Sequence, residues 1–468
     1  MWGKVQVFVG GVVSRIVPKS NNTAEQKKPQ KYLYERPHFL CLGQKQQQEA
    51  KSTSSRTILT VGENLPRRAG YAEVINGGKS AVNEDQGAAE EFYLGYKPAK
   101  TAKALIQTAT ASAQKQPLMA MTEVVGDGSD VVPVTYFGIF DGHAGADAAI
   151  FASKILHKHI EDKLNCAWEV INQKLAPSKQ DAERLSLGNI SNISVDDLIT
   201  GILEEAFVDL DDQIMRERLT YTIRGGCAAI IAMFMFGKVY VANAGDCRAV
   251  LCNGEKTIPL SRDHTPYAER ERLTHLGDAK PELLHGEFTC TEYTRRIFRE
   301  DVGRRVLYRS PHMSGWGYKV ADYDALKFPL VTRNGKKSRL METIGVARGF
   351  GDHDLRVFDS EIYVKPFLSS IPEVEIYDTK AGELGENCVL IMASDGLWDV
   401  ISNSEAAAIV RQTLATYNTN DYKRYTAAAR ELVTQARGFH VGQGWRKKNT
   451  DDHASFDDIT VFVIPLHD

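Results

Sequence analysis

The 468-residue chain has little net charge, because its 57 Lys and Arg are balanced by 60 Asp and Glu. It therefore lacks the basic excess that is typical of nucleic-acid-binding proteins, and we expect no nucleic-acid partner. It also has no apolar run of about 18 residues, the length that a membrane-spanning helix requires. An apolar fraction of 43% is nonetheless sufficient for a folded core.

Cysteine is scarce and scattered, with seven residues and no CxxC pair. The absence of paired spacing argues against a structural zinc site. An odd number of isolated cysteines also argues against a disulfide framework and favours free thiols in a reducing compartment.

The first 24 residues contain basic residues but no acidic ones. If the segment is helical, it has an apolar stripe formed by Trp2, Val5, Val9, Val12 and Ile16. Three interpretations remain open: a membrane-contact helix over residues 1–17, a mitochondrial transit peptide, or a tail without either role. Residues 18–56 are polar and aperiodic, so the sequence predicts an N-terminal tail over 1–56 and a folded domain over 57–468.

Strand and helix patterns alternate in blocks along the rest of the chain. Strands are predicted over residues 134–140, 227–236, 239–244, 389–393 and 459–464. Helical periodicity is found over 146–164, 195–218, 267–276, 404–414 and 426–436. This order favours a layered α+β fold with antiparallel sheets. Residues 97–131 are rich in Ala, Thr, Lys and Gln and are predicted to form a mobile surface insertion.

Carboxylates stand beside several of these strands. Asp141 ends one strand in FGIFDGH, Asp395 follows another in LIMASDG, and Asp457 precedes a third in FDDITVFVI. A fourth element, AVNEDQ, adds Glu84 and Asp85. An aspartate at a strand end is usually a turn residue, but four such elements together predict one acidic cluster. Oxygen ligands without His or Cys suit Mg²⁺ or Mn²⁺, and two such ions can activate a bridging water for phosphoryl transfer.

Five ordered motifs, FDGHAG, ANAGDCRAVL, GVARGFGD, ASDGLWDV and DDITVFVI, resemble those of the PP2C family of metal-dependent protein phosphatases. The resemblance covers about residues 68–466. It implies a β-sandwich of two antiparallel sheets flanked by pairs of helices, and hydrolysis of phosphoserine and phosphothreonine on proteins.

The resemblance also implies roles for individual residues. Two Mg²⁺ or Mn²⁺ ions would be held by Asp85, Asp141, Asp395 and Asp457, by the carbonyl of Gly142, and by Glu84 through a water. A weaker third ion would be bound by Asp395 together with Asp246 and Asp399. His143 would be the general acid that protonates the leaving oxygen, a role that suits an imidazole.

Two features depart from the common family pattern. Where many members have a phosphate-binding arginine, the nearest basic residue is Lys79, which binds phosphate as a point charge. The flap, residues 264–344, is unusually long, and residues 295–339 contain 12 Lys and Arg against 4 Asp and Glu. This flap is either a surface that recognises an acidic or phosphorylated partner or a solvated basic face.

The segments YERPHFL and GYAEVINGGKSAVNEDQ are similar to the animal subfamily with members H, J and M. That likeness implies a cytoplasmic, Golgi-associated enzyme with a membrane-contact N-terminus, acting on phosphorylated Rab GTPases. The alternatives are an enzyme similar to mitochondrial pyruvate dehydrogenase phosphatase, a phosphatase for small phosphoesters, and an inactive pseudophosphatase that serves as a binding module. The retention of every metal carboxylate and of His143 favours activity.

Overall fold

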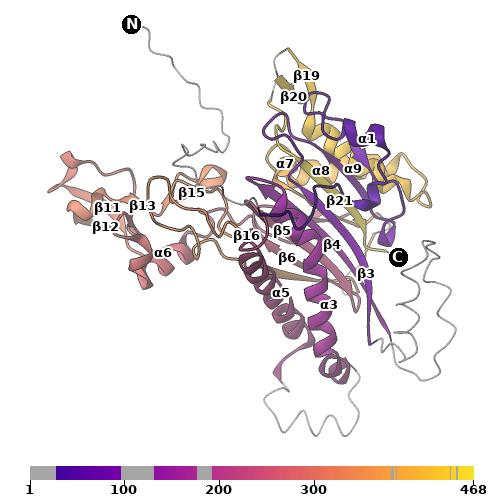
Figure 1. Ribbon diagram of the computed structural model, residues 1–468, viewed down its shortest axis with the longest axis horizontal. Coiled ribbons are helices and arrows are strands. Elements are labelled where there is room, and N and C mark those ends of the chain that lie inside the picture. The colour runs from indigo at the N-terminus through magenta and orange to yellow at the C-terminus, as the bar shows by residue number, and fades with distance from the viewer. Residues whose placement is uncertain are drawn as a thin grey trace.

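The computed structural model describes residues 28–95, 131–175, 192–380, 384–385, 387–442, 444–448 and 452–467. The predicted helix over 1–17 and nearly all of the predicted insertion over 97–131 lie outside these residues. Two sheets stack at the centre of the molecule, and the flap extends from one end (Figure 1).

The first sheet has the strand order β17-β6-β5-β4-β3, with the short β16 paired to β5, and all its pairings are antiparallel. Its strands are β3 (Gln86–Leu94), β4 (Val132–His143), β5 (Gly226–Met235), β6 (Lys238–Ala244), β16 (Phe350–Gly351) and β17 (Glu373–Asp378). The predicted hairpin between β5 and β6 turns at Phe236 and Gly237, where φ is 55° and 72°. A glycine tolerates this left-handed backbone without strain.

The second sheet has the order β1-β2-β21-β18-β7-β8 and is also antiparallel. Its strands are β1 (Leu59–Thr60), β2 (Gly70–Val74), β7 (Arg248–Asn253), β8 (Lys256–Pro259), β18 (Val389–Ala393) and β21 (Ile459–Pro465). Side chains from both sheets fill the space between them, and the ring centroids of Phe137 and Phe462 lie 5.4 Å apart. This shared core fixes the two sheets relative to each other.

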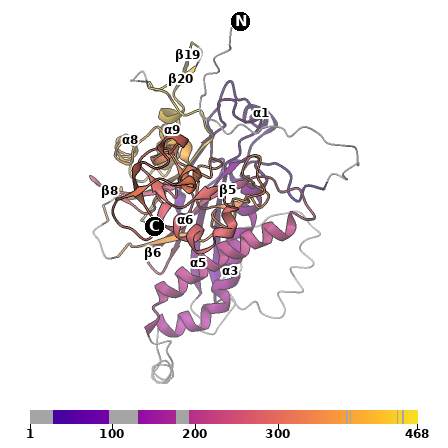
Figure 2. The same cartoon turned by 90° about the vertical axis from the view of Figure 1, so that its left-hand side faces the viewer.

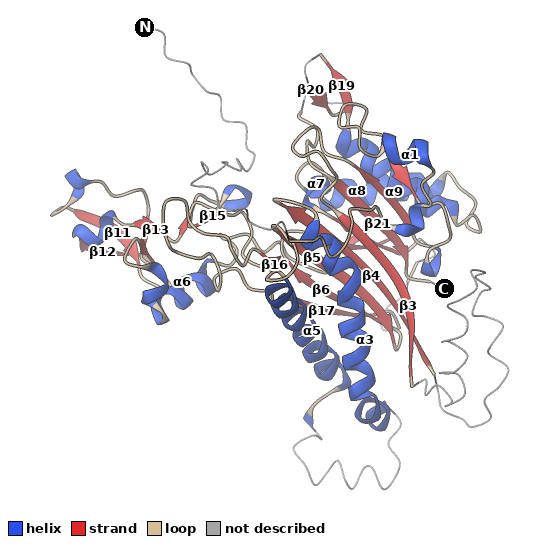
Figure 3. Ribbon diagram, viewed as in Figure 1, coloured by secondary structure: helices blue, strands red, loops and turns tan. Residues whose placement is uncertain are grey.

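Helices cover the outer face of each sheet, as Figure 3 shows. Helices α3 (Asp147–Leu175) and α5 (Val195–Glu217) pack on the first sheet, and α8 (Asn403–Ala415) and α9 (Lys423–Arg437) pack on the second. Ser194 and Asp197 form a reciprocal capping box at the start of α5. The predicted α-β-β-α sandwich is therefore confirmed. Among the described helices, none combines the length and apolarity needed to cross a membrane.

The predicted start of the folded domain at residue 57 is too late, because described residues of the preceding segment pack against the domain. Phe39 and Leu40, in the 3-10 turn η1 (His38–Leu40), are buried, and Phe39 packs edge-on against Tyr71. The guanidinium of Arg36 forms a bidentate ion pair with the buried Glu73, at 2.6 and 2.7 Å. Arg56 is fully buried as well. The segment also contains the helix α1 (Gln44–Glu49). The polar composition of the segment gave no signal of these contacts, two of which are made by arginines.

The flap has a small hydrophobic core of its own, and in Figure 2 it faces the viewer, in front of the sandwich. Its elements are α6 (Arg270–Ala279), η5 (Pro281–Leu284), β9 (Phe288–Thr289), β10 (Glu292–Tyr293), η6 (Arg299–Asp301), β11 (Arg305–Arg309), β12 (Gly317–Val320), η7 (Tyr323–Leu326), β13 (Phe328–Pro329), β14 (Val331–Thr332), η8 (Gly335–Lys337) and β15 (Arg339–Leu340). That core continues past residue 344, because Ile362, Val364 and Phe367 belong to it. The flap is therefore a larger unit than the predicted 264–344.

Three short elements complete the described structure. The turn η2 (Pro66–Arg68) precedes β2, the helix α7 (Asp395–Trp398) follows β18, and the hairpin β19 (Phe439–Val441) to β20 (Gly444–Arg446) follows α9. Of these, α7 matters most for function, because it begins with a predicted metal ligand.

Candidate metal centre and active site

Three predicted carboxylates meet where the ends of the two sheets come together. Asp141 lies near the end of β4, Asp246 lies in the turn between β6 and β7, and Asp395 is the first residue of α7. Each offers an oxygen within 4.8 Å of the others. The backbone amide of Asp395 lies 3.4 Å from Oδ2 of Asp141 and donates to it. Elements far apart in sequence thus converge on one acidic cluster.

Asp85 and Asp457 border this cluster. Asp85 precedes β3 and is 1% exposed; the hydroxyl of Ser394 donates to its Oδ2 at 2.7 Å, while its Oδ1 has no hydrogen-bond partner among the described residues. Asp457 precedes β21 and forms an ion pair with Lys79. A buried carboxylate oxygen without a partner is costly unless a cation or a proton satisfies it.

Burial, together with the proximity of these groups, raises the pKa of several carboxyls. Burial raises the pKa of Asp85 to about 6. Burial, followed by the carboxylates of Asp263 and Asp399, raises the pKa of Asp246 to about 7. Burial and the neighbouring carboxylates also raise the pKa values of Asp141 and Asp395 well above the usual range. An all-oxygen cluster with too much negative charge is the environment that Mg²⁺ or Mn²⁺ ions would neutralise, so these residues fit the expected metals.

We expect the stabilising effect of Mg²⁺ to grow as pH rises from about 4 to about 7. The pKa values of Asp85 and Asp246 are raised in the fold, so without metal the folded state binds these protons more tightly and loses stability over this window. Melting temperatures measured with saturating Mg²⁺ and with EDTA should therefore diverge by several degrees across it. A constant difference would contradict the raised pKa values.

Side chains outside the acidic cluster hold the loop between β2 and β3 in place. Both carboxylate oxygens of Asp458 accept backbone amides, from Asn76 at 2.7 Å and from Glu84 at 3.0 Å. The side chain of Asn76 in turn accepts the amides of Gly78 and Ser80, at 2.9 and 3.1 Å. This leaves Asp457, rather than Asp458, to face Lys79 and the cluster.

The buried side chain of Arg56 also holds the loop between β2 and β3 in place. Its guanidinium donates to the carbonyls of Ile75, Ser455 and Asp457, at 2.7, 2.6 and 2.7 Å. It thereby joins the end of β2 to the segment that precedes β21. The sequence reasoning missed Arg56, because an arginine in a polar stretch gives no signal of burial.

Gly142 packs tightly against the backbone of Glu84, another predicted ligand. A Cβ atom at this position would lie 2.5 Å from the carbonyl oxygen of Glu84, so a larger residue would push the two strands apart. Burial raises the pKa of Glu84, and the nearby His143 partly offsets this. Gly142 directly follows Asp141 of the cluster, and the charges of Asp457 and Lys79 also act on the carboxyl of Glu84.

His143, the last residue of β4, has a partner that the sequence did not reveal. Its Nε2 lies 2.6 Å from Oδ2 of Asp352, a residue that directly follows β16. Burial lowers the pKa of His143, but the carboxylate of Asp352, together with those of Asp246 and Glu84, outweighs that effect and the pKa is raised. Asp211 on α5 supports this arrangement by accepting the amide of Gly351 at 2.9 Å. The imidazole is thus held near the cluster and kept protonated to higher pH.

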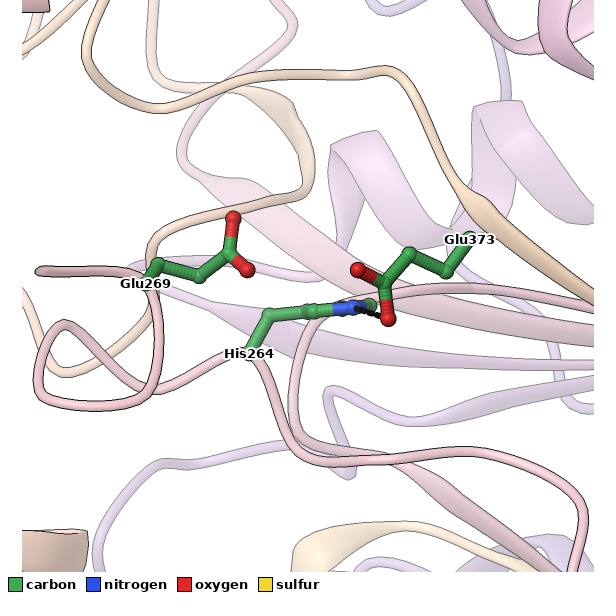
Figure 4. Close-up of side chains that lie close together, drawn as sticks. All are labelled: His264, Glu269 and Glu373. Atoms are coloured by element: carbon green, nitrogen blue, oxygen red, sulfur yellow. Dashed lines mark ion pairs between the residues drawn. The ribbon is translucent and has the colours of Figure 1, made fainter. Parts of the chain in front are cut away.

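A separate group of possible ligands lies between the start of the flap and β17. Figure 4 shows His264, Glu269 and Glu373, whose ligand atoms lie within 4.8 Å of one another. Three arginines already neutralise the two glutamates, with Arg272 and Arg348 at 2.6 and 2.9 Å from Glu269 and Arg262 bridging both. The His264 side chain is fully buried, and burial lowers its pKa. This group is therefore an ion-pair network rather than a metal site.

Comparison with known proteins identifies the family. The family model described as protein phosphatase 2C matches residues 101–279 and 330–440, so part of the flap falls outside the match. Protein phosphatase 1H of Rattus norvegicus is 41% identical over 94% of this chain and 92% of its own length. Protein phosphatase 1J of Mus musculus is 40% identical over 97% of this chain and 90% of its own length.

Among solved structures, the serine-threonine phosphatase 2C of Toxoplasma gondii aligns with a TM-score of 0.44 and 16% identity, over 87% of this chain and 98% of that chain. The family match includes Asp141, His143, Asp246 and Asp395, and the two relatives extend over most of the chain. This chain therefore belongs to the protein phosphatase 2C family.

Proposed function

We propose that this phosphatase holds two Mg²⁺ or Mn²⁺ ions with Asp85, Asp141, Asp395 and Asp457, the carbonyl of Gly142, and Glu84 through a water. The single observation that supports this best is the convergence of Asp141 and Asp395, with oxygens within 4.8 Å, beside a buried Asp85 whose Oδ1 lacks a partner. Bound divalent ions would supply the positive charge that lets water attack a phosphate at neutral pH.

The side chains around the ions would position the phosphate and the leaving group. Lys79 is half-exposed, and its ion pair with Asp457 keeps its ammonium at the cluster, where it can contact a phosphate oxygen. Burial lowers the pKa of Lys79, but the carboxylates of Asp457, Asp395 and Asp141 together more than offset this, so the pKa is raised and the ammonium persists. His143, kept protonated by Asp352, would give its proton to the departing serine or threonine oxygen.

We also propose phosphorylated small GTPases of the Rab class as the substrates. We further propose that residues 1–17 make a peripheral contact with the cytoplasmic face of a membrane such as the Golgi. Support comes from the subfamily resemblance and from the flap, where Trp316, Tyr318 and Tyr323 are exposed beside many basic residues. An exposed surface with both aromatic and basic side chains is typical of a protein-binding site.

The test is phosphate release from a phosphothreonine peptide and from a phosphorylated Rab protein, each with Mn²⁺ or Mg²⁺ and again with EDTA. Release that EDTA abolishes supports the metal assignment. A faster reaction with the Rab protein than with the peptide supports the substrate class, whereas equal rates contradict it. A folded protein that releases no phosphate under any metal would indicate a pseudophosphatase binding module.

A further inference from the structure

A lysine at a tip of the flap reaches one of the residues predicted to bind a third ion. Lys336, in the 3-10 turn η8, donates to the carbonyl of Trp398 at 2.8 Å and to Oδ1 of Asp399 at 2.7 Å. These partners end α7, whose first residue is Asp395. Asp399 lies one helical turn after Asp395, so the two side chains face the same side. The flap thus places a positive charge beside the acidic cluster.

The electrostatic environment connects Asp399 to that cluster. The Asp399 carboxylate is one of the charges that raise the pKa of Asp246 and of Asp395. An ammonium paired with Asp399 neutralises part of the charge that a divalent cation would need at this position. A cation and the ammonium of Lys336 therefore compete for the same carboxylate oxygens.

The hairpin that contains Lys336 is anchored at its base, not at its tip. The buried hydroxyl of Ser338 accepts the amide of Tyr267 at 3.1 Å, and the amide of Met341 donates to the carbonyl of Leu330 at 2.8 Å. Leu330, Leu340 and Met341 lie in the flap core. By contrast, the side chains of Lys336 and Asp399 are 47% and 52% exposed. The tip can consequently leave Asp399 without unfolding the flap.

We propose that Lys336 competes with the third metal ion for Asp399, so that the position of the flap tip and the occupancy of that ion are coupled. The inference rests on the proposed third-ion site formed by Asp246, Asp395 and Asp399. When the ion binds, the ammonium of Lys336 is displaced from Asp399 and the flap tip is released from α7. When the ion is absent, the tip is held against the end of α7.

The strength of the pair sets the size of the expected effect. An ion pair between half-exposed groups changes an equilibrium by up to about fivefold. A contact this weak can be displaced by a metal ion that binds with millimolar affinity. We therefore expect Lys336→Gln to tighten binding of the weakest Mn²⁺ ion by about two- to fivefold, without changing the two tighter ions.

The experiment is a Mn²⁺ titration of the full chain followed by electron paramagnetic resonance, which counts free Mn²⁺ and requires no turnover. The matched control is Lys337→Gln, which removes the same charge from the adjacent exposed position of the same turn. If Lys336→Gln binds the weak ion like the wild type, or if Lys337→Gln tightens it equally, the proposal is wrong. Asp399→Asn separates the two hypotheses: if it leaves weak-ion binding intact, the third-ion site itself fails, whereas loss of that binding with no effect of Lys336→Gln removes only the competition.

Hydrogen exchange gives a second readout of the same coupling. In the wild type, filling the weak site should increase amide exchange in residues 333–338, because the tip loses its contact with α7. In Lys336→Gln this segment should already exchange faster and should not respond to the ion. An unchanged exchange pattern in the wild type, at Mn²⁺ concentrations shown to fill the site, would overturn the coupling.

Discussion

Asp395→Asn should reduce phosphate release from a phosphothreonine peptide by more than about a hundredfold, while the protein remains folded. Changes in residues that only support a metal ligand commonly cost ten- to a hundredfold, so loss of a ligand should cost more. The amide of Asn has nearly the same shape as the carboxylate and keeps the start of α7 intact. Activity is measured with saturating Mn²⁺, and folding by circular dichroism.

Without metal, the same substitution is expected not to lower the stability of the protein. Asp395 lies among carboxylates that raise its pKa, so removing its charge relieves repulsion, and the variant in EDTA should melt at the same or a higher temperature than the wild type. Asp354→Asn is the control, because it removes one carboxylate from an exposed pair with Arg218. If Asp395→Asn keeps more than about a tenth of wild-type activity, the ligand assignment is incorrect.

His143→Ala should slow hydrolysis of a phosphothreonine peptide by about a hundred- to ten-thousandfold, the usual range for loss of a general acid. Hydrolysis of an aryl phosphate should fall much less, because an aryl oxygen leaves without help from a proton. The ratio of the two rates, measured with the same enzyme preparation, isolates proton donation from metal binding. An equal loss for both substrates would argue against the acid role.

The substitution Asp352→Asn provides a second test of the role of His143. The carboxylate of Asp352 raises the pKa of His143, so its removal should lower that pKa. With the peptide substrate, the alkaline decline of the rate should therefore move to lower pH, while the rate for the aryl phosphate should change little. A shift toward higher pH would contradict the pairing seen at 2.6 Å.

The sequence was most informative where one side chain pattern repeats along a strand. Runs such as the one that ends at Asp141 have alternating or continuous apolar residues, and these determine both the strand and the position of the acid at its end. The antiparallel order and the capping box at Ser194 follow from local signals of the same kind. The fold class and the acidic cluster were therefore accessible before the structure was known.

Contacts between distant polar residues were not accessible in this way. Arg36 and Arg56 lie in a stretch that reads as an exposed tail, yet each is buried because carboxylate or carbonyl oxygens elsewhere in the chain satisfy its guanidinium. Asp352 is 209 residues from His143, and the motif GVARGFGD that contains it does not indicate which residue it contacts. Pairings of this kind depend on tertiary geometry, which no local pattern records.

The position of β21 between β2 and β18 has a consequence for synthesis on the ribosome. The final strand of the domain inserts between strands that were made earlier, and Asp457 lies two residues before it. The second sheet cannot close, and the acidic cluster cannot be completed, until this last segment has emerged. Until β21 pairs with them, the facing edges of β2 and β18 lack their hydrogen-bond partners, and unpaired strand edges of this kind make an incomplete chain prone to aggregation.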